Sequence, residues 1–409
     1  MQRGFDRFYG TLHGAGSFWD PSALVRDNQF ISPYTDKEYQ PQGPYYYTNA
    51  ISDNAVRYIK EHDQKQPFFL YVAYTAPHWP MHAPEDVIDS YKGVYDGGYE
   101  PIRQMRYQRM KTLGIVDDTC LLSEQAGNWE MVSNKQWEIR LMQTYAAMIS
   151  LMDEGVGKII KELEATGQLE NTLILFLHDN GGCAEGTGRQ KTSVKQEKIL
   201  QHTKAWVQTR GREVTRDGRI VRTGSDAMPG PEDTFMAYGR SWANVSNTPF
   251  REYKQYVHEG GISTPLIAYW PKGIHEKNGF RHSPGHIIDI MATCVELSGQ
   301  KYPSTYHGHK IIPYEGKSLL PLFKQDQAEE RVLLFEHLGN AAIRVGKWKL
   351  VGKKRFIGNQ VKKDGWELYN LEKDRSEMND LSQLYPEKVR DLLGLFEKEA
   401  KRTFILPKK

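Results

Sequence analysis

Three short runs of consecutive apolar and aromatic residues constrain the fold of this chain most. They lie at residues 67–74, 171–177 and 264–270. Runs of this length without polar alternation are typical of strands buried on both faces, as strands in a parallel sheet are. Between the first two runs, apolar residues recur in steps of three and four over residues 142–163, and Gly167 follows where a helix would end. A strand, a helix and a strand in this order predict a parallel βαβ unit in an α/β fold.

The length of 409 residues is large for a single hydrophobic core, so a second, smaller domain is expected. After residue 330 the pattern changes to short strands separated by turns that contain Gly or Lys, and an amphipathic helix follows. This pattern is typical of a small antiparallel sheet with one helix. We therefore predict a main α/β domain over residues 1–325 and a C-terminal antiparallel subdomain over residues 326–409. Helices are predicted over residues 49–60, 285–297 and 386–401, and late strands over 333–336, 341–345, 348–351 and 366–369.

Charge and cysteine content narrow the range of partners. The net charge of +3 comes from 54 basic and 51 acidic residues, and it gives no reason to expect nucleic acid or a membrane surface. Three cysteines are too few and too scattered for a disulfide framework or a zinc site. No apolar run has the length of a membrane span. The first residues lack the apolar core of a signal peptide, but a trimmed chain would look the same, so the compartment stays open.

Polar clusters lie next to all three apolar runs. Open parallel sheets bind their ligands at the carboxyl ends of strands, so these clusters are the natural places to look for a site. His78 lies in a Pro-rich stretch after the first run, and Asp179 and Asn180 follow the second. Lys254 and His258 precede the third run. Together these positions offer a carboxylate, an amide, two imidazoles and an ammonium group.

Each cluster also has a purely structural interpretation. Asp179 and Asn180 are oxygen donors of the kind that hard divalent cations prefer, yet Asp-Asn-Gly is also common turn chemistry. His78 could equally be a partly buried structural histidine, and Lys254 alone would be a solvated lysine. Glu259 with the two glycines after it would form a bend before a strand. A functional site is indicated because all of these clusters occur in one chain and in order, each beside the end of a predicted strand.

These segments resemble the central and later motifs of the sulfatase family, the arylsulfatase-type, formylglycine-dependent enzymes of the alkaline-phosphatase-like superfamily. The resemblance covers nearly the whole chain, and its motifs are specific in combination and weaker singly. It implies an alkaline-phosphatase-like, mostly parallel sheet flanked by helices. The matching segments are Gly4–Gly10, Ala76–Pro80, Leu177–Gly182, Lys254–Pro265, Gly285–Ile290 and Gly316–Leu319.

The resemblance also implies roles for individual residues. Asp179 and Asn180 match the second pair of ligands to a single calcium ion. Lys254 matches the lysine that holds a sulfate oxygen, and His78 matches the histidine that contacts the sulfate and the ester oxygen. His258, in the same segment as Lys254, is expected to bind substrate. In such enzymes a formylglycine hydrate, made from cysteine or serine, attacks sulfur while calcium and cationic side chains offset the negative charge.

One part of the family pattern is missing. The family opens with paired aspartates, which supply the first two calcium ligands, and continues with a Cys-x-Pro-x-Arg signature that carries the nucleophile. The residues after Cys120, Cys183 and Cys294 do not fit that signature. We therefore expect that an upstream portion on the order of a hundred residues is absent, and that this chain shows no turnover. We also expect weak calcium binding and an excess of positive charge from Arg251 and Lys254, favouring sulfate-like anions.

The sequence thus predicts a sulfuric ester hydrolase that acts on an aryl or carbohydrate sulfate, with a sulfated small molecule or glycan as partner and no nucleic acid. The alternatives are an inactive fragment, a sulfate-binding pseudoenzyme, or a phosphodiesterase-type relative. Relatives of the last kind bind two metals through several Asp and His ligands. The sequence His178-Asp179-Asn180 lacks such an Asp-His pair, which favours one calcium ion.

Overall fold

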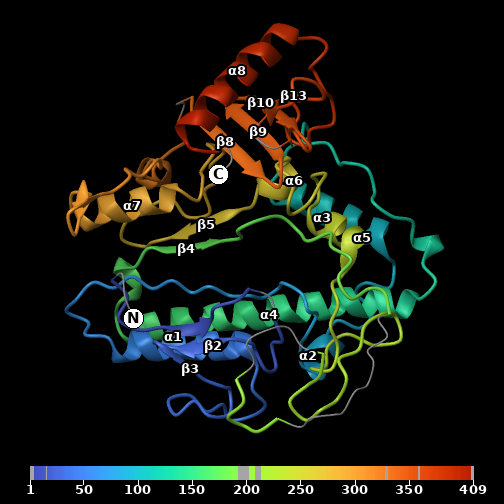
Figure 1. Ribbon diagram of the computed structural model, residues 1–409, viewed down its shortest axis with the longest axis vertical. Coiled ribbons are helices and arrows are strands. Elements are labelled where there is room, and N and C mark those ends of the chain that lie inside the picture. Colours follow the sequence, from blue (N-terminus) through green and yellow to red (C-terminus); the bar gives the residue numbers. More distant parts are fainter. Residues whose placement is uncertain are drawn as a thin grey trace. The chain divides into compact units, whose positions relative to one another are not determined.

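The computed structural model places the chain in two units (Figure 1). It describes residues 4–14, 16–191, 202–207, 213–327, 330–357 and 360–406. Unit 1 consists of residues 1–109, 124–168 and 182–248, and unit 2 of residues 110–123, 169–181 and 249–409. This division differs from the domain boundary that the sequence predicts at residue 325, which stays a prediction.

Two helices that lie side by side form the frame of unit 1, α1 (Tyr47–Glu61) and α4 (Lys135–Ala165) (Figure 1). Both confirm predicted helices. Helix α4 starts before its apolar stripe because Asn134 caps it, with Oδ1 accepting from the Trp137 N–H at 3.1 Å. It ends at Gly167, whose φ of 70° is the left-handed conformation that closes many helices.

The rest of unit 1 consists of short elements around this helix pair. A small antiparallel sheet has the order β1-β2-β3, and beneath it the buried Arg26 guanidinium binds Asp36 and Asn54. The elements are β1 (Tyr9–Thr11), β2 (Leu24–Arg26), β3 (Gln29–Phe30), α2 (Glu85–Asp89), α3 (Tyr99–Thr112, which crosses into unit 2), η1 (Trp129–Met131) and α5 (Gly239–Ser246).

In unit 2, β4 (Ile174–Leu177) pairs with β5 (Leu266–Tyr269). Both strands lie where the sequence predicts them. Their direction differs from the expected parallel sheet: the pair is antiparallel, with Ile174 opposite Tyr269 and Leu177 opposite Leu266. An apolar run indicates that a strand is buried. It does not indicate whether the strand runs parallel or antiparallel to its neighbour, because that depends on how the connecting segment returns to the sheet. Ile267 of β5 is nevertheless 60% exposed, so the expected burial on both faces is also wrong for this strand.

The first apolar run, residues 67–74, forms no strand ladder in the part of the chain that the structure describes. Its side chains alternate between half-buried and exposed, and Phe69 and Tyr71 are 63% and 73% exposed. The predicted strand and the parallel βαβ unit built on it are therefore wrong for the described residues. The composition of an apolar run shows that its side chains favour burial. A β-strand also needs a neighbouring strand to which its backbone N–H and C=O groups can bond, and composition does not show that.

The C-terminal sheet of unit 2 confirms the predicted antiparallel subdomain. Its strands are β8 (Val332–His337), β9 (Asn340–Val345), β10 (Trp348–Gly352) and β13 (Glu367–Asn370), in the order β13-β10-β9-β8. Helix α8 (Pro386–Arg402) covers one face (Figure 1), and Phe396 packs there against Ile343, Leu350 and Leu368. On the opposite face, Val257 packs against the strands.

The remaining elements of unit 2 are short. Helix α7 (Asp289–Ser298) ends at Gly299, as predicted, with a φ of 64°. No helix within the described ranges combines the length and apolar character that a membrane span requires. The short elements are η2 (Leu169–Asn171), α6 (Glu259–Ile262), β6 (Thr305–Tyr306), β7 (His309–Lys310), η3 (Leu320–Phe323), β11 (Phe356–Ile357) and β12 (Gln360–Val361).

Candidate functional site

The residues that the sequence singles out divide between the two units. Asp179, Asn180, Lys254 and His258 belong to unit 2, and His78 belongs to unit 1. The expectation that His78 and Lys254 reach one cleft stays a prediction.

Residues 251–258, which we call the Lys254 loop, lead directly into α6 and are folded back against it. The Gly260 N–H donates to the Arg251 carbonyl oxygen at 3.1 Å. A Cβ atom on Gly260 would lie 2.1 Å from that oxygen, and one on Gly261 would lie 2.1 Å from the Tyr256 oxygen. Glycine is therefore required at both positions because backbone carbonyls approach too closely for a side chain. This is the physical reason for the Glu-Gly-Gly sequence.

The backbone on either side of Lys254 has an unusual conformation. Glu252 and Gln255 have φ values of 63° and 79°, in the left-handed region that non-glycine residues seldom adopt. Such conformations persist where the surrounding structure holds them. The Lys254 side chain itself is half-buried.

Asp179 and Asn180 follow β4 directly, on a turn that lies beside α6. The Gly181 N–H donates to the Gly261 carbonyl oxygen at 3.0 Å, and Thr264 Oγ1 donates to the His178 oxygen at 2.8 Å. The antiparallel pairing produces this arrangement, because the end of β4 meets the start of β5. Asp179 is exposed and Asn180 is half-buried. The structure therefore brings the Asp-Asn turn next to the segment that carries Lys254 and His258.

His258 is fully buried, and its partner is a carboxylate of the C-terminal sheet. His258 Nε2 lies 3.3 Å from Glu367 Oε2, and the Tyr369 hydroxyl donates to the same oxygen at 2.7 Å. Burial raises the pKa of Glu367, but the His258 contact, Tyr369 and Arg251 outweigh it and lower that pKa to about 2. His258 Nδ1 is buried without a hydrogen-bond partner among the described residues.

Arg251 does not add to an excess of positive charge. Its guanidinium pairs with Glu367 and donates to the Tyr369 hydroxyl at 3.0 Å. We expected Arg251 and Lys254 together to give an excess of positive charge. For Arg251 this expectation is wrong, because the Glu367 carboxylate offsets its charge within unit 2. Sequence reasoning missed this pairing because Glu367 lies 116 residues further along the chain.

A second buried charge network joins α6 to the C-terminal sheet. Lys349 Nζ donates to Glu259 Oε1 at 2.7 Å and lies 2.8 Å from Glu377 Oε1, an ion pair without hydrogen-bond geometry. The Glu259 N–H donates to Glu377 Oε2 at 2.8 Å. Burial raises the pKa of Glu259, but the charges of Lys349 and then Arg375 outweigh it, so the pKa is lowered.

The sequence does contain an indication that Lys349 is buried and paired, although no motif includes this residue. In Trp348-Lys349-Leu350-Val351, alternation puts Lys349 on the same face of the strand as Val351, so this face is buried too. A lysine on a buried face needs an anionic partner.

His78 is held within unit 1. It follows the extended run 67–74, between the cis peptide bonds Ala76–Pro77 and Trp79–Pro80. Its Nδ1 lies 2.8 Å from the Trp79 carbonyl oxygen, and the Trp79 Nε1–H donates to Glu185 Oε2 at 2.8 Å. Its expected position at a strand end is wrong, because the segment before it forms no strand.

The described residues do not complete a metal site by themselves. Among them, no group of three or more His, Cys, Asp and Glu side chains is placed to hold an ion. Asp179 and Asn180 offer two oxygen donors, whereas calcium takes about six to eight. These two residues fit part of a calcium site and leave most of its ligands to other groups.

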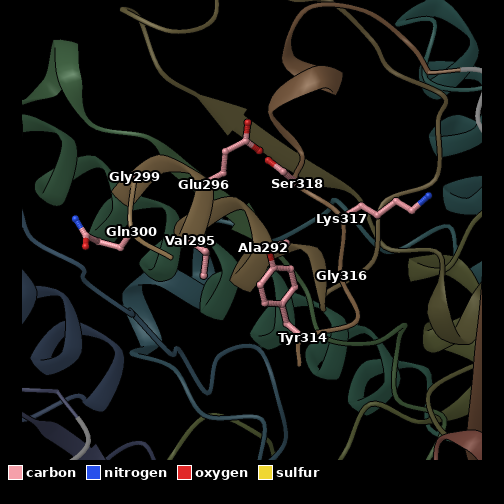
Figure 2. Close-up of a pocket in the computed structure, with 9 residues that line it drawn as sticks. All are labelled: Ala292, Val295, Glu296, Gly299, Gln300, Tyr314, Gly316, Lys317 and Ser318. Atoms are coloured by element: carbon pink, nitrogen blue, oxygen red, sulfur yellow. The ribbon is translucent and has the colours of Figure 1, made fainter. Parts of the chain in front are cut away.

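A cavity of about 560 Å³ in unit 2 lies apart from the candidate residues. It lies between α7 and residues 314–318, and none of the candidate site residues lines it. Figure 2 shows the Glu296 carboxylate beside Ser318 at this cavity, while the Lys317 side chain extends away from them. Gly316, Lys317 and Ser318, which line it, belong to the family-matching segment Gly316–Leu319, but this segment carries none of the candidate site residues.

The helices, the Asp-Asn turn after β4 and the Lys254 loop define the class of protein as an α/β protein with a small antiparallel C-terminal sheet. The sulfatase family model matches residues 1–300. The C-terminal model of N-sulphoglucosamine sulphohydrolase matches residues 251–394. The chain belongs to the sulfatase family.

Individual relatives agree with this assignment. The chain is 28% identical to an uncharacterized sulfatase of Schizosaccharomyces pombe, over 96% of this chain and 70% of that protein. It is 32% identical to an arylsulfatase of Klebsiella aerogenes, over 78% of this chain and 65% of the relative. The chain thus spans about two thirds of the length of these relatives.

Solved structures show the same fold. Ps i-CgsB in complex with k-i-k-neocarrahexaose matches with a TM-score of 0.59 and 22% identity, over 97% of this chain and 67% of the other. BT4656, in complex with its substrate D-glucosamine-2-N,6-O-disulfate, matches with a TM-score of 0.55 and 18% identity, over 98% and 77%. The predicted α/β, alkaline-phosphatase-like fold class is confirmed.

Proposed function

We propose that this chain serves the hydrolysis of sulfate esters and that it binds the sulfate group of its substrate. The observation that carries the proposal is the Asp179–Asn180 turn, which lies beside the segment with Lys254 and His258, joined by the 3.0 Å bond from Gly181 to Gly261. Ammonium, imidazole and amide groups can donate hydrogen bonds to a small oxyanion, whereas the exposed Asp179 carboxylate would need a cation between it and the sulfate.

In this proposal each side chain has a distinct part. Lys254 holds a sulfate oxygen through a charge-assisted hydrogen bond, and the bond strengthens as negative charge grows during ester cleavage. His78 binds the sulfate and the ester oxygen. His258 is fully buried and its Nε2 lies against Glu367, so its contact with substrate would be through Nδ1, which has no partner among the described residues. Asp179 and Asn180 would hold part of the ligand shell of one calcium ion, which would supply further charge for the sulfate oxygens.

The proposed substrate is a sulfated aryl compound or glycan. The relative from Klebsiella is called an arylsulfatase, and a mouse relative is called N-acetylgalactosamine-6-sulfatase. Two structural neighbours were solved with a neocarrahexaose and with a disulfated glucosamine. These names support a sulfated ring as the substrate, without choosing between an aryl and a sugar ring.

The nucleophile is proposed to come from polypeptide outside this sequence, because the sequence contains no Cys-x-Pro-x-Arg signature. For this reason the second candidate function is sulfate binding without turnover. Removing a single electrostatic donor from an active site already costs about a hundredfold or more in rate. We therefore expect purified chain to release no sulfate from an aryl sulfate such as p-nitrophenyl sulfate. Steady release that is blocked by His78→Ala would contradict this.

Titration calorimetry with sodium sulfate tests the binding proposal. We expect sulfate to bind the folded chain and Lys254→Ala to weaken it by about tenfold or more, since hydrogen bonds to charged groups are worth about 1.5–3 kcal/mol. Lys347→Ala, at an exposed lysine of the C-terminal subdomain, should leave binding unchanged. The proposal is wrong if sulfate does not bind, or binds equally to the Lys254→Ala variant. Inorganic phosphate binding more tightly than sulfate would favour the phosphodiesterase-type alternative.

A further inference from the structure

The Lys254 loop contacts the C-terminal subdomain at several points between Arg251 and His258. Asn340, at the start of β9, donates through Nδ2 to the Gln255 carbonyl oxygen at 2.8 Å. Lys353, just after β10, donates through Nζ to Glu252 Oε1 at 2.5 Å. Glu252 and Gln255, the two loop residues with a left-handed backbone conformation, are therefore the residues that these two bonds hold. A strained backbone persists when neighbours fix it in this way.

The two ends of the loop are held by buried charges. At its start, Arg251 pairs with Glu367 and bonds to Tyr369, both on β13. At its end, His258 lies against the same Glu367 carboxylate, and Glu259 is bound by Lys349 of β10. Lys349 is fully buried and pairs with both Glu259 and Glu377. If it moved, these two carboxylates would stay buried without a cationic partner.

Apolar packing completes the contact. Val257 and Ile262 pack against Ala342, Val351 and Tyr369 on the face of the sheet opposite to α8. Together these contacts leave the loop few alternative conformations. The C-terminal sulphohydrolase model begins at residue 251 and runs to 394, so loop and sheet are also matched as one piece.

We propose that Lys349 and Glu367 are positioning residues, through which the C-terminal sheet sets the orientation of Lys254 and His258. The proposal rests on the proposed function, since the loop matters only if it binds sulfate. Neither residue needs to touch the ligand. Lys349 fixes the start of α6 through Glu259, and Glu367 fixes the His258 ring and Arg251. A displacement of such a loop by about 1 Å is enough to weaken a directed contact substantially.

Two variants separate positioning from simple stability. Lys349→Met keeps most of the length of the side chain and removes its charge, and Glu367→Gln keeps the shape and one acceptor oxygen. Their matched controls are Lys347→Met and Glu372→Gln, an exposed pair with Nζ and Oε2 3.9 Å apart in the same subdomain. Glu367→Gln keeps the test decisive if Lys349→Met does not fold, because this carboxylate is 27% exposed and its loss is milder.

Each variant is measured in two ways, by amide hydrogen exchange and by sulfate calorimetry on the folded chain. In Glu367→Gln we expect exchange over residues 252–262 to rise by about tenfold or more, while Ile343 in the centre of β9 keeps its protection. In Lys349→Met, whose global stability also falls, we expect exchange over residues 252–262 to rise by more than exchange at Ile343 does. We expect sulfate affinity to fall by about tenfold in the same variants. The control variants should change neither quantity.

The outcomes distinguish this proposal from the proposed function. If sulfate binding depends on Lys254 but both variants leave exchange and affinity unchanged, Lys349 and Glu367 do not position the loop. A uniform rise in exchange across the whole C-terminal sheet, with sulfate affinity intact, would show a purely structural role and also overturn the proposal. If no variant of the chain binds sulfate, the proposed function fails, and a local rise in exchange would still show that the sheet holds the loop.

Discussion

Lys349 Nζ and Glu259 Oε1 form a 2.7 Å ion pair in which the lysine side chain is 0% exposed and the glutamate 4%. Glu377 adds a second buried carboxylate at 2.8 Å, and an Arg375 nitrogen lies 3.8 Å from Glu259. Two buried carboxylates therefore share one buried lysine, and Arg375, whose side chain is 41% exposed, adds positive charge from the edge. Such a cluster is sensitive to the loss of any one member, because the remaining charges stay away from water.

Replacement of Lys349 by methionine should lower the free energy of unfolding by about 3–5 kcal/mol, the cost of leaving buried charges without a partner. Urea denaturation followed by tryptophan fluorescence measures this change. Lys347→Met should stay within about 0.5 kcal/mol of the parent. The triple change Lys349→Met, Glu259→Gln and Glu377→Gln should recover much of the loss, since it removes the unpaired charges. A loss below about 1 kcal/mol for Lys349→Met would contradict this account.

Gly260→Ala should be destabilising by about 1–3 kcal/mol, because the new Cβ would overlap the Arg251 carbonyl oxygen and move the loop. Gly394→Ala is the matched control. Gly394 lies within α8, where an added Cβ meets no atom within 4 Å, so alanine there should stabilise the helix by about 0.5–1 kcal/mol. Thermal unfolding of both variants checks the contrast in sign. Equal effects at the two positions would show that the close approach at Gly260 is absent.

The Glu367 carboxyl predicts a pH dependence. Its pKa is lowered from its usual 4.5 to about 2 in the folded chain, so its contribution to stability is complete above about pH 4.5 and is lost as the pH falls toward 2. Glu367→Gln lacks this titration. The stability difference between the parent and this variant should therefore shrink below pH 4.5, by at most about 1.4 kcal/mol per pH unit. Denaturation at several pH values from 6 to 3 measures it, and a constant difference would refute the assignment.

Calcium should bind this chain weakly. As proposed ligands, Asp179 and Asn180 would provide two of the roughly six to eight oxygen ligands that calcium takes, and water would have to fill the other positions. Calorimetry with calcium chloride should show little heat, and Asp179→Ala should change it no more than Asp391→Ala on the exposed face of α8 does. Tight calcium binding that Asp179→Ala abolishes would show that the described residues hold more of the ion's ligands than we infer.

Periodic sequence patterns predicted much of the fold. The three- and four-residue steps from Met142 to Leu163 predicted α4, because they mark a helix face that must be buried. The short strands separated by Gly- or Lys-containing turns after residue 330 predicted the antiparallel C-terminal sheet, and the amphipathic pattern after them predicted its helix. The family motifs predicted the sulfatase family correctly, and the ordered combination of the segments around His78, Asp179 and Lys254 with the other matching segments carried that prediction. The roles of these residues as ligands stay predictions.

Long-range pairing could not be predicted from the sequence. Residues 67–74 have the composition of a buried strand, yet whether a strand forms depends on a partner that composition does not name. The pairs Arg251–Glu367 and Glu259–Lys349 join positions 116 and 90 residues apart, and any acid could have been the partner of either cation. One indication was available. Lys349 lies on the same strand face as Val351, and a lysine on a buried face needs an acidic partner.

The dependence of the Lys254 loop on β9, β10 and β13 has a consequence for protein engineering. A graft that moved the loop alone into a related enzyme would leave behind the groups that bind Glu252, Gln255 and Glu259, so the transplanted backbone would relax. The loop and the residues that hold it all lie between Arg251 and Glu377. Recombination between sulfatases that aims to exchange substrate preference should therefore place its crossover before Pro249 and keep the recipient's own C-terminal sheet out of the hybrid.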